Sequence, residues 1–303
     1  MSSQTVLITG ASGFLGWNLA RHFHGRGYDV VGTWHSRKPD HAVTRQCVQF
    51  DLEEDDAARL LAAAAPDAVV HCAALSSRKE CEADPARARR VNVDATARLA
   101  EAAAEHEAVF VFISSDLVFD GSAAPYGEDD TPSPASVYGE TKAEAEERVC
   151  ALDSRHHILR CALLYGTDAW RHPGGFLAWN VGEPLRGNPV RLYTNQYRMP
   201  LYVADVGVAI EALLARRAAG GSLPSGTWHL AGPERLTRHE IGRRIAAEFD
   251  LPEDLMQPVT LERDARYGPV DDTSLRTDKI IEATGIAFTP LDLGLAETAR
   301  NCI

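Results

Sequence analysis

Tyr138 and Lys142 are a pair of residues whose side chains could act together in chemistry. They stand four residues apart in the stretch "ASVYGETKAEAEE" (residues 135–147), and residues at that spacing share one face of a helix. A phenol beside an ammonium group can take part in proton transfer. A single pair of this kind is also typical of an exposed helix surface, so its meaning depends on the elements around it.

A serine joins this pair from the preceding apolar segment. Ser114 and Ser115 end the stretch "AVFVFISS", which we interpret as a buried strand. In a parallel sheet, ligands bind beyond the carboxyl ends of the strands. Ser115, Tyr138 and Lys142 therefore form a candidate set for one site at the carboxyl edge of the sheet.

A glycine pattern near the N-terminus predicts a dinucleotide site. Gly10, Gly13 and Gly16 are spaced as G-x-x-G-x-x-G in "VLITGASGFLGWNLA", between an expected strand and an expected helix. Glycine lets the chain turn sharply and lets a pyrophosphate approach backbone N–H groups at the positive end of a helix. Glycines at a turn can also be purely structural, but this setting favours the nucleotide site. The expected cofactor contacts here include Ser12, Phe14 and Leu15.

The end of the second expected strand favours NADP(H) over NAD(H). An NAD site commonly has an acidic residue there, which binds the ribose 2′-hydroxyl. This sequence has Ser36, Arg37 and Lys38 instead, and cations with a hydroxyl suit a 2′-phosphate. The two cations can also be ordinary exposed loop residues, so NAD(H) stays the alternative. Asp51 and Leu52, after the third expected strand, are placed to contact the adenine.

Alternating strand and helix patterns predict an α/β fold with a doubly wound parallel sheet of the Rossmann type. Apolar strand-like runs alternate with helical patterns through the first half of the chain. The texture changes after residue 166, where Gly, Pro and Trp are frequent. We expect a nucleotide-binding domain from residues 1–166, rejoined by about 202–231. Residues 167–201 and 232–303 are expected to form a smaller substrate-binding domain.

Composition excludes several classes of protein. The chain has 303 residues, is 45% hydrophobic and carries a formal charge of −12 without a basic run. This charge argues against binding of nucleic acid through phosphate contacts. No apolar run approaches the length of a membrane span, and no cationic region precedes the first apolar stretch. The six cysteines include no C-x-x-C pair, so we expect no metal site and a soluble cytoplasmic protein.

Taken together, the motifs resemble those of the extended short-chain dehydrogenase/reductases. The resemblance rests on the glycine pattern, "HCAA", "VNVDAT", "ISSDLVFDG", "YGETK" and "LRCALLYG". Within that superfamily, "SSDLVFDGSAAPYGEDDTPSPASVYGETKAEAE" is similar to the dTDP-4-dehydrorhamnose reductase family. The later segments "NQYRMPLYVADV", "GTWHLAG" and "DDTSLRTDK" also fit that family, so the similarity covers nearly the whole chain.

This resemblance implies an NADPH-dependent reductase of a nucleotide-linked 4-keto-6-deoxy sugar, as in dTDP-rhamnose biosynthesis. Tyr138 would protonate the carbonyl oxygen, helped by Lys142, because an unperturbed tyrosine has a pKa of about 10. Lys142 would also hydrogen-bond the nicotinamide ribose, and Ser115 would hydrogen-bond the carbonyl oxygen. Further expected cofactor contacts are Cys72, Ala73, Ala74 and Asn92, the last of which could equally be a helix hydrogen-bonding residue. Expected substrate contacts are Ser115, Asp116, Val118, Gln196 and Arg198.

Two departures and two alternatives concern the substrate. Leu117 stands where the family usually has Tyr, and Asn195 stands where an acidic residue is common. One relative, the regulatory β-subunit of methionine adenosyltransferase, keeps the fold and an NADP site but acts as a binding partner. A nucleotide-sugar epimerase or dehydratase is the other alternative, although Leu117 replaces the Glu that a dehydratase would need. Expected partners are a nucleotide sugar and, as one option, a second copy of the chain.

The basic residues after the second expected strand generate a test. We expect the protein to bind NADPH more tightly than NADH, and Arg37→Ala to weaken binding of NADPH alone, because only NADPH carries the 2′-phosphate. Titration of nicotinamide fluorescence measures both affinities. Equal affinity for the two cofactors in the wild-type protein would contradict the assignment of Arg37 and Lys38.

Overall fold

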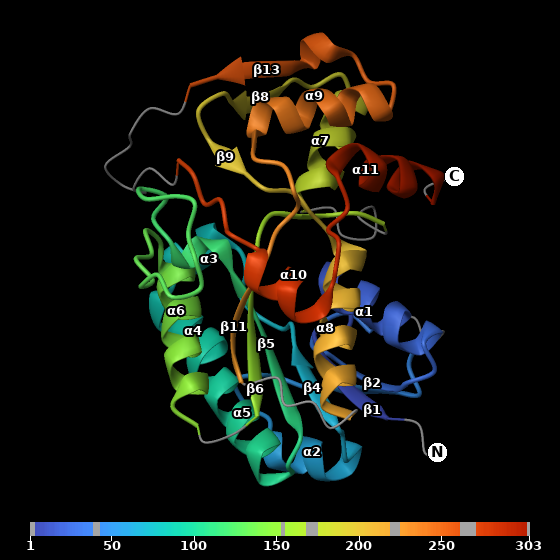
Figure 1. Ribbon diagram of the computed structural model, residues 1–303, viewed down its shortest axis with the longest axis vertical. Coiled ribbons are helices and arrows are strands. Elements are labelled where there is room, and N and C mark those ends of the chain that lie inside the picture. The colour runs from blue at the N-terminus through green and yellow to red at the C-terminus, as the bar shows by residue number, and fades with distance from the viewer. Residues whose placement is uncertain are drawn as a thin grey trace.

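The computed structural model has a parallel sheet at its centre. It describes residues 4–38, 43–152, 155–167, 175–218, 225–260 and 271–301. Within these residues, seven parallel strands run in the order β11-β6-β5-β4-β1-β2-β3. The predicted doubly wound α/β fold is confirmed (Figure 1). The strands are β1 (Thr5–Thr9), β2 (Asp29–Trp34), β3 (Gln46–Gln49), β4 (Ala68–His71), β5 (Val109–Ser115), β6 (His156–Cys161) and β11 (Gly226–Leu230).

Helices cover both faces of this sheet, which explains why its strands are apolar throughout. Alternate residues of a strand point to opposite faces: Val6 and Ile8 of β1 join one apolar cluster, and Leu7 joins another. The first cluster includes side chains of α1 (Phe14–Gly25) and α8 (Val203–Ala218). The second includes side chains of α2 (Ala57–Ala64), α5 (Ala95–Glu105) and α6 (Val137–Cys150).

Short elements follow the carboxyl ends of two central strands. After β4 come α3 (Arg78–Ala83), α4 (Pro85–Arg89) and the π-helical turn η2 (Arg90–Asp94), which leads into α5. After β5 comes a single 3₁₀ turn, η3 (Asp116–Val118). Of the polar residues that the sequence singles out, Asn92 lies in η2 and Asp116 lies in η3.

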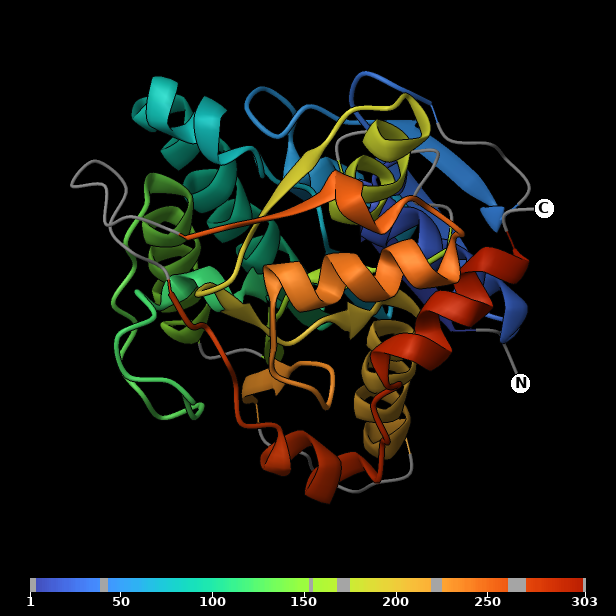
Figure 2. The ribbon, with the colours of Figure 1, turned by 90° about the horizontal axis from the view of Figure 1, so that it is seen from above.

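A second group of elements lies beyond the carboxyl ends of the strands, at the top of Figure 1 and nearest the viewer in Figure 2. It includes three small pairs of strands, β13–β8, β12–β9 and β10–β7. Its elements are β7 (Leu164–Tyr165), α7 (Phe176–Leu185), β8 (Val190–Tyr193), β9 (Tyr197–Arg198), β10 (Leu201–Tyr202), β12 (Leu236–Thr237), α9 (Arg238–Glu248), η5 (Glu253–Leu255), β13 (Met256–Val259) and α11 (Leu291–Arg300). Helix α10 (Asp278–Thr284) packs instead beside β11.

This second group has an apolar core of its own. A cluster of buried residues runs from Tyr165 through Val190 and Ile241 to Leu295. The intervening helix α8 and strand β11 belong to the central sheet unit, because β11 pairs with β6 and α8 packs against α1. The division into two domains, with the chain returning to the first at about residues 202–231, stays a prediction.

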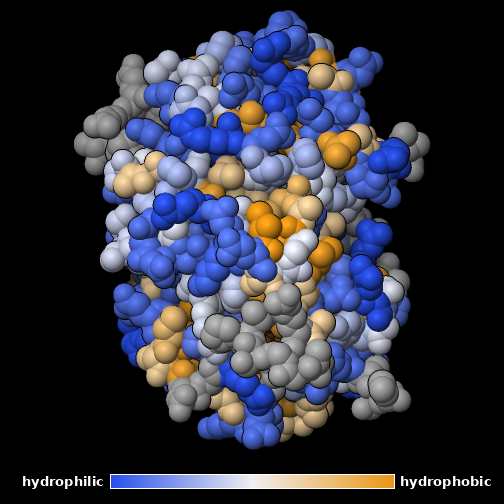
Figure 3. All heavy atoms as spheres, in the orientation of Figure 1, coloured by the Kyte–Doolittle hydropathy of each residue, from blue (hydrophilic) through white to orange (hydrophobic). Residues whose placement is uncertain are grey.

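The surface seen in Figure 3 is mostly hydrophilic, with small apolar areas between charged side chains. The apolar residues of the strands and helices are instead buried between the layers. Within the described part of the chain, no helix combines the length and the apolar character needed to span a bilayer.

The turn between β1 and α1 depends on two glycines. Gly10 has φ +67°, in the left-handed region, and a Cβ there would lie 2.9 Å from Cα of Ala73. A Cβ on Gly16 would overlap the carbonyl oxygen of Gly10. Gly13 is the N-cap of α1, and its N–H donates to the same carbonyl at 2.9 Å. The bare backbone thus lets α1 begin directly over the turn.

We expect Gly16→Ala to lower the free energy of unfolding by about 1–3 kcal/mol, because the added methyl group meets backbone that cannot move aside. Gly25→Ala is the matched control in the same helix, since no atom lies within 4 Å of a Cβ there. Helix propensity predicts a gain of up to about 1 kcal/mol for the control. Urea unfolding measures both, and equal stabilities for the two variants would contradict this account of the turn.

Candidate cofactor and catalytic site

The N-terminus of α6 is fixed by three contacts, which together place Tyr138. The Ser136 side chain accepts a hydrogen bond from the N–H of Gly139 at 3.2 Å, and Glu82 of α3 accepts one from the N–H of Val137 at 3.0 Å. A Cβ on Gly139 would overlap the carbonyl oxygen of Leu117 in η3. The lack of a side chain at Gly139 therefore lets α6 approach the end of β5 closely.

This approach brings Tyr138 to Ser115. The Ser115 hydroxyl donates to Asp116 at 3.2 Å and accepts from the N–H of Leu117 at 3.2 Å. Burial raises the pKa of Tyr138, the charge of Asp116 raises it further, and the polar Ser115 side chain opposes the rise. The phenol is therefore protonated at neutral pH and is suited to donate a proton.

Lys142 lies one turn further along α6 and is buried. Its Nζ is 3.9 Å from the centre of the Phe112 ring on β5, a cation–π contact. Burial lowers the pKa of Lys142 to about 8, and the charge of Glu146 opposes this change. The expected help from Lys142 in favouring the phenolate thus depends on pH, because only the protonated amine carries the charge.

The loop after β4 is joined to the turn after β1. The Thr9 hydroxyl accepts hydrogen bonds from the N–H groups of Cys72 at 3.1 Å and Ala73 at 3.2 Å. Ala73 also packs against Gly10. Two segments that the sequence assigns to the cofactor, residues 10–16 and 72–74, therefore lie side by side at the carboxyl edge of the sheet.

His71 extends this connection through the core. Thr96 donates its hydroxyl proton to the carbonyl oxygen of Asn92 at 2.7 Å, so it can only accept from His71 Nε2 at 3.0 Å. His71 Nδ1 must then accept from the hydroxyl of Thr9 at 2.7 Å. Burial lowers the pKa of His71 to about 3, and Lys142 adds to this effect. The ring is therefore neutral, with its proton on Nε2.

The structure gives Asn92 a positioning role. Its Oδ1 accepts from the N–H of Leu75 at 2.8 Å, and its Nδ2 donates to the Leu75 carbonyl and to Thr141, both at 3.0 Å. Only 1% of Asn92 is exposed. The amide thus ties the loop after β4 to α6, and the alternative of a hydrogen-bonding helix residue describes Asn92 better than a direct cofactor contact.

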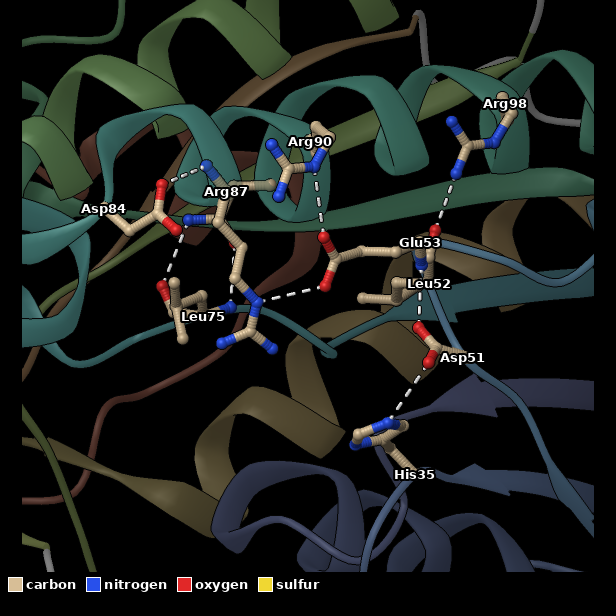
Figure 4. A network of polar contacts seen from close by, with 10 residues as sticks. His35, Asp51, Leu52, Glu53, Leu75, Asp84, Arg87, Arg90 and Arg98 are labelled. Carbon is tan, nitrogen blue, oxygen red and sulfur yellow. Dashed lines mark hydrogen bonds and ion pairs between the residues drawn. The ribbon is translucent and has the colours of Figure 1, made fainter.

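Figure 4 shows the polar network that holds Asp51 and Leu52. Asp51 Oδ1 accepts from the N–H of Glu53 at 2.9 Å, and its Oδ2 lies 3.3 Å from Nε2 of His35 at the end of β2. Arg98 donates to the Leu52 carbonyl at 2.6 Å. The half-buried segment is therefore ordered beside the end of β2, where an adenosine group would reach it.

Arg37 reaches the glycine turn. Its Nη2 donates to the carbonyl oxygen of Ser12 at 3.0 Å, across 25 positions of sequence. Ser36, Arg37 and Lys38 are all exposed. The Arg37 guanidinium therefore lies between the end of β2 and the turn that begins α1.

On the opposite side of Tyr138, arginines gather around a buried carboxyl group. Asp116 is 5% exposed and accepts from the Thr273 hydroxyl at 2.5 Å. Burial raises its pKa, and the charges of Arg198 and Arg238 oppose the rise. Burial lowers the pKa of Arg238 to about 9, and repulsion by Arg198 and Arg78 contributes. Arg78, Arg198 and Arg238 thus lie close enough to influence one another, with Asp116, Asp271 and Asp272 as the nearby carboxyl groups.

Gln196 orients one of these arginines. Its side-chain Oε1 accepts from Nε of Arg238 at 2.9 Å, and its carbonyl oxygen accepts from the N–H of the same residue at 2.9 Å. The Arg238 guanidinium also lies 5.0 Å from the Phe176 ring. Arg198 itself lies in β9, and Gln196, two residues earlier, acts through Arg238.

The structure corrects one expected contact and adds two residues. Val118 is fully buried in the apolar cluster beneath α1 and α8, so its side chain serves packing and not substrate contact. Sequence reasoning missed Arg78 and Arg238. Arg78 opens α3 just after "HCAALSS", and Arg238 follows the capping residue Thr237 in "LTRHE", so both stand at helix starts that face the sheet edge.

Comparison with known proteins agrees with this geometry. A family model described as RmlD substrate binding domain matches residues 4–302. Methionine adenosyltransferase 2 subunit beta of Rattus norvegicus is 32% identical over 259 residues, covering 85% of this chain and 76% of that protein. The probable low-salt glycan biosynthesis reductase Agl14 of Haloferax volcanii is 32% identical over 245 residues, covering 79% and 78%.

Among solved structures, MoeE5 in complex with UDP-glucuronic acid and NAD is similar over the whole fold. It superposes with a TM-score of 0.82 at 28% sequence identity, covering 99% of this chain and 100% of that chain. The similarity therefore includes the central sheet and the elements beyond its carboxyl edge.

Proposed function

Because the chain belongs to the RmlD substrate binding domain family, we propose that it is an NADPH-dependent reductase of a nucleotide-linked 4-keto-6-deoxy sugar. The observation that carries this proposal is the close approach of the start of α6 to the end of β5, which brings the Tyr138 segment beside Ser115 with Lys142 one turn away. Agl14, a relative named as a reductase, and MoeE5, which binds NAD and a UDP-sugar, support the same chemistry.

The residues around the first turn fit a nicotinamide dinucleotide. Glycine at positions 10 and 16 lets α1 begin directly over the turn after β1, and the N–H groups at the start of α1 would bind a pyrophosphate there. Asp51 and Leu52 would receive the adenine, and Cys72, Ala73 and Ala74 would line the path toward the nicotinamide. Arg37, held at the carbonyl of Ser12, would bind the 2′-phosphate, which favours NADP(H).

The chain's own groups can then complete a carbonyl reduction. A bound dihydronicotinamide supplies the hydride. Tyr138 donates its proton to the carbonyl oxygen, and its raised pKa keeps that proton available at neutral pH. Ser115 donates a hydrogen bond to the same oxygen as negative charge develops. Lys142 holds the nicotinamide ribose and, when protonated, stabilises the phenolate that remains.

The arginines near Asp116 suit the diphosphate of a sugar nucleotide. Arg198 and Arg238 lie in a buried region where their charges repel each other, and an anion would relieve that repulsion. Arginine can bind phosphate oxygens in a bidentate manner. Arg78 reaches the same region from the other side, since α3 belongs to the central sheet unit. A diphosphate bound here would place the attached sugar toward Ser115 and Tyr138.

A non-catalytic role is the second candidate, because methionine adenosyltransferase 2 subunit beta is as similar in sequence as the reductase Agl14. In that case the protein would bind NADPH and act on a partner protein. Oxidation of NADPH with a panel of nucleotide-linked 4-keto sugars separates the two. Turnover with any of them supports the reductase, and binding of NADPH without turnover supports the regulatory role.

Tyr138→Phe should abolish reduction while the affinity for NADPH stays nearly unchanged. The substitution keeps the ring and removes the donated proton, and loss of a general acid typically slows a reaction by about 10²–10⁴-fold. Stopped-flow absorbance of NADPH measures the rate. Lys142→Met should reduce both turnover and NADPH affinity, whereas the exposed Glu140→Gln on the same helix is a control that should change neither. A Tyr138→Phe variant with wild-type turnover would remove Tyr138 from the mechanism.

Arg198→Ala and Arg238→Ala should each raise the KM for the nucleotide sugar at least about tenfold, with a smaller change in kcat, because each loses a charged contact to the diphosphate. Steady-state kinetics at saturating NADPH test this expectation. Arg243→Ala is the matched control on α9, since Arg243 pairs with Glu253 at the surface. If KM stays at the wild-type value, the two arginines instead form charge pairs between elements of the fold.

A further inference from the structure

Glu146 lies at the centre of a buried polar cluster beneath Lys142. Its carboxylate accepts hydrogen bonds from Arg160 of β6, with Nη2 at 2.7 Å and Nε at 3.0 and 3.1 Å from its two oxygens. It also accepts from the hydroxyl of Ser114 on β5. Glu146 and Arg160 are each 4% exposed. One carboxylate thus joins α6 to two neighbouring strands of the sheet.

The residues of this cluster stand at fixed spacings from the candidate catalytic residues on the same elements. Glu146 stands four residues after Lys142 and eight after Tyr138, on the face of α6 that meets the sheet. Its partner Ser114 directly precedes Ser115. A shift of α6 along the sheet would therefore break the contacts of Glu146 and displace Tyr138 from Ser115 at the same time.

Arg160 is itself held from the opposite side. Its Nη1 donates to the carbonyl oxygen of Glu128 and to Nε2 of His229, both at 3.4 Å, and its guanidinium lies 5.1 Å from the ring of Phe119. Burial lowers the pKa of His229 to about 3, with Arg160 adding to the effect. A neutral imidazole can accept this hydrogen bond, so Arg160 is anchored independently of Glu146.

Stability alone does not account for these buried charges. Removing charged groups from water costs several kcal/mol each, and apolar residues of similar size often serve stability equally well. Lys142 and Arg160 bring two positive charges into this region and Glu146 brings one negative charge. The groups facing Lys142 are Glu146, the neutral ring of His71, and the thiols of Cys72 and Cys161. Burial raises the pKa of Cys161 to about 12, and it also raises that of Cys72.

We propose that Glu146 is a positioning residue: held by Arg160 and Ser114, it fixes the register of α6 on the sheet and holds a carboxylate one helical turn from Lys142. The carboxylate provides the full negative charge next to Lys142, because the thiols are protonated and the imidazole is neutral. Its loss lets the amine release its proton at lower pH. The role of Lys142 in binding the nicotinamide ribose, on which the kinetic consequence depends, rests on the proposed function.

The direct test is the titration of Lys142 in the full-length protein without cofactor, observed by NMR with ¹³C at lysine Cε and assigned with Lys142→Met. An opposite charge nearby typically changes a pKa by about 1–3. Glu146→Gln should therefore move the midpoint of the Lys142 titration to a pH about 1 or more below that of the wild-type protein. Glu147→Gln, the exposed neighbour on the same helix, should leave the midpoint in place. An unchanged midpoint in Glu146→Gln overturns the proposal.

NADPH affinity across pH supplies a second readout. The affinity of Glu146→Gln at pH 8 should be lower than that of the wild-type protein by about fivefold when the Lys142 midpoint lies about 1 pH lower, and it should recover toward the wild-type value at pH 6. A loss that is equal at every pH indicates a merely structural effect and overturns the charge role. The double variant Glu146→Met with Arg160→Met serves if Glu146→Gln alone folds poorly, because it also removes the guanidinium that has lost its carboxylate. Its NADPH affinity should show the same altered dependence on pH.

The two tests separate this proposal from the proposed function. The NMR titration requires neither cofactor nor substrate, so its result stands whether or not the protein reduces a sugar. The midpoint of the Lys142 titration could move as expected while the NADPH affinity of the wild-type protein does not change as Lys142 loses its proton. In that case the assignment of Lys142 to the ribose is wrong, and the role of Glu146 stands.

Discussion

The absence of a side chain at Gly139 is the constraint on which the arrangement of the site depends. Only bare backbone lets the first turn of α6 rest on the Leu117 carbonyl in η3. That contact sets the distance between α6 and the end of β5, and so brings together Tyr138 and Ser115. Ser136 and Glu82 then fix the angle at which the helix starts. Because α6 is a continuous helix, this first contact also sets the positions of Lys142 and Glu146 further along it.

Burial gives the site its electrostatic character. It raises the pKa of Tyr138 and of Asp116, and it lowers the pKa of Lys142 and Arg238. In each case burial favours the neutral form, because charge is poorly solvated there. Lys142 and Arg238, with pKa values of about 8 and about 9, still carry positive charge at neutral pH. A site of this kind is best matched by a ligand that carries several negative charges, as a dinucleotide and a sugar nucleotide both do.

Much of the fold could be predicted from local patterns. Apolar runs and glycine positions located all seven strands of the central sheet, because strands buried on both faces are apolar throughout. The same patterns located the turn at Gly10 and the face shared by Tyr138 and Lys142. Tertiary contacts could not be predicted in this way. Val118 looked accessible beside Asp116, yet the 3₁₀ turn directs it into the core. Arg78 and Arg238 are distant in sequence, and only the folded chain brings them near each other.

The second apolar core draws its residues from both sides of α8 and β11. Tyr165 and Val190 precede those elements, and Ile241 and Leu295 follow them. During synthesis the central sheet can therefore gain most of its strands while this core is still missing its last helix. The core closes only after α11 has left the ribosome. Until then, α9 and β10 lack the helix that packs on them, and apolar surface of the nascent chain that α11 later covers is open to aggregation.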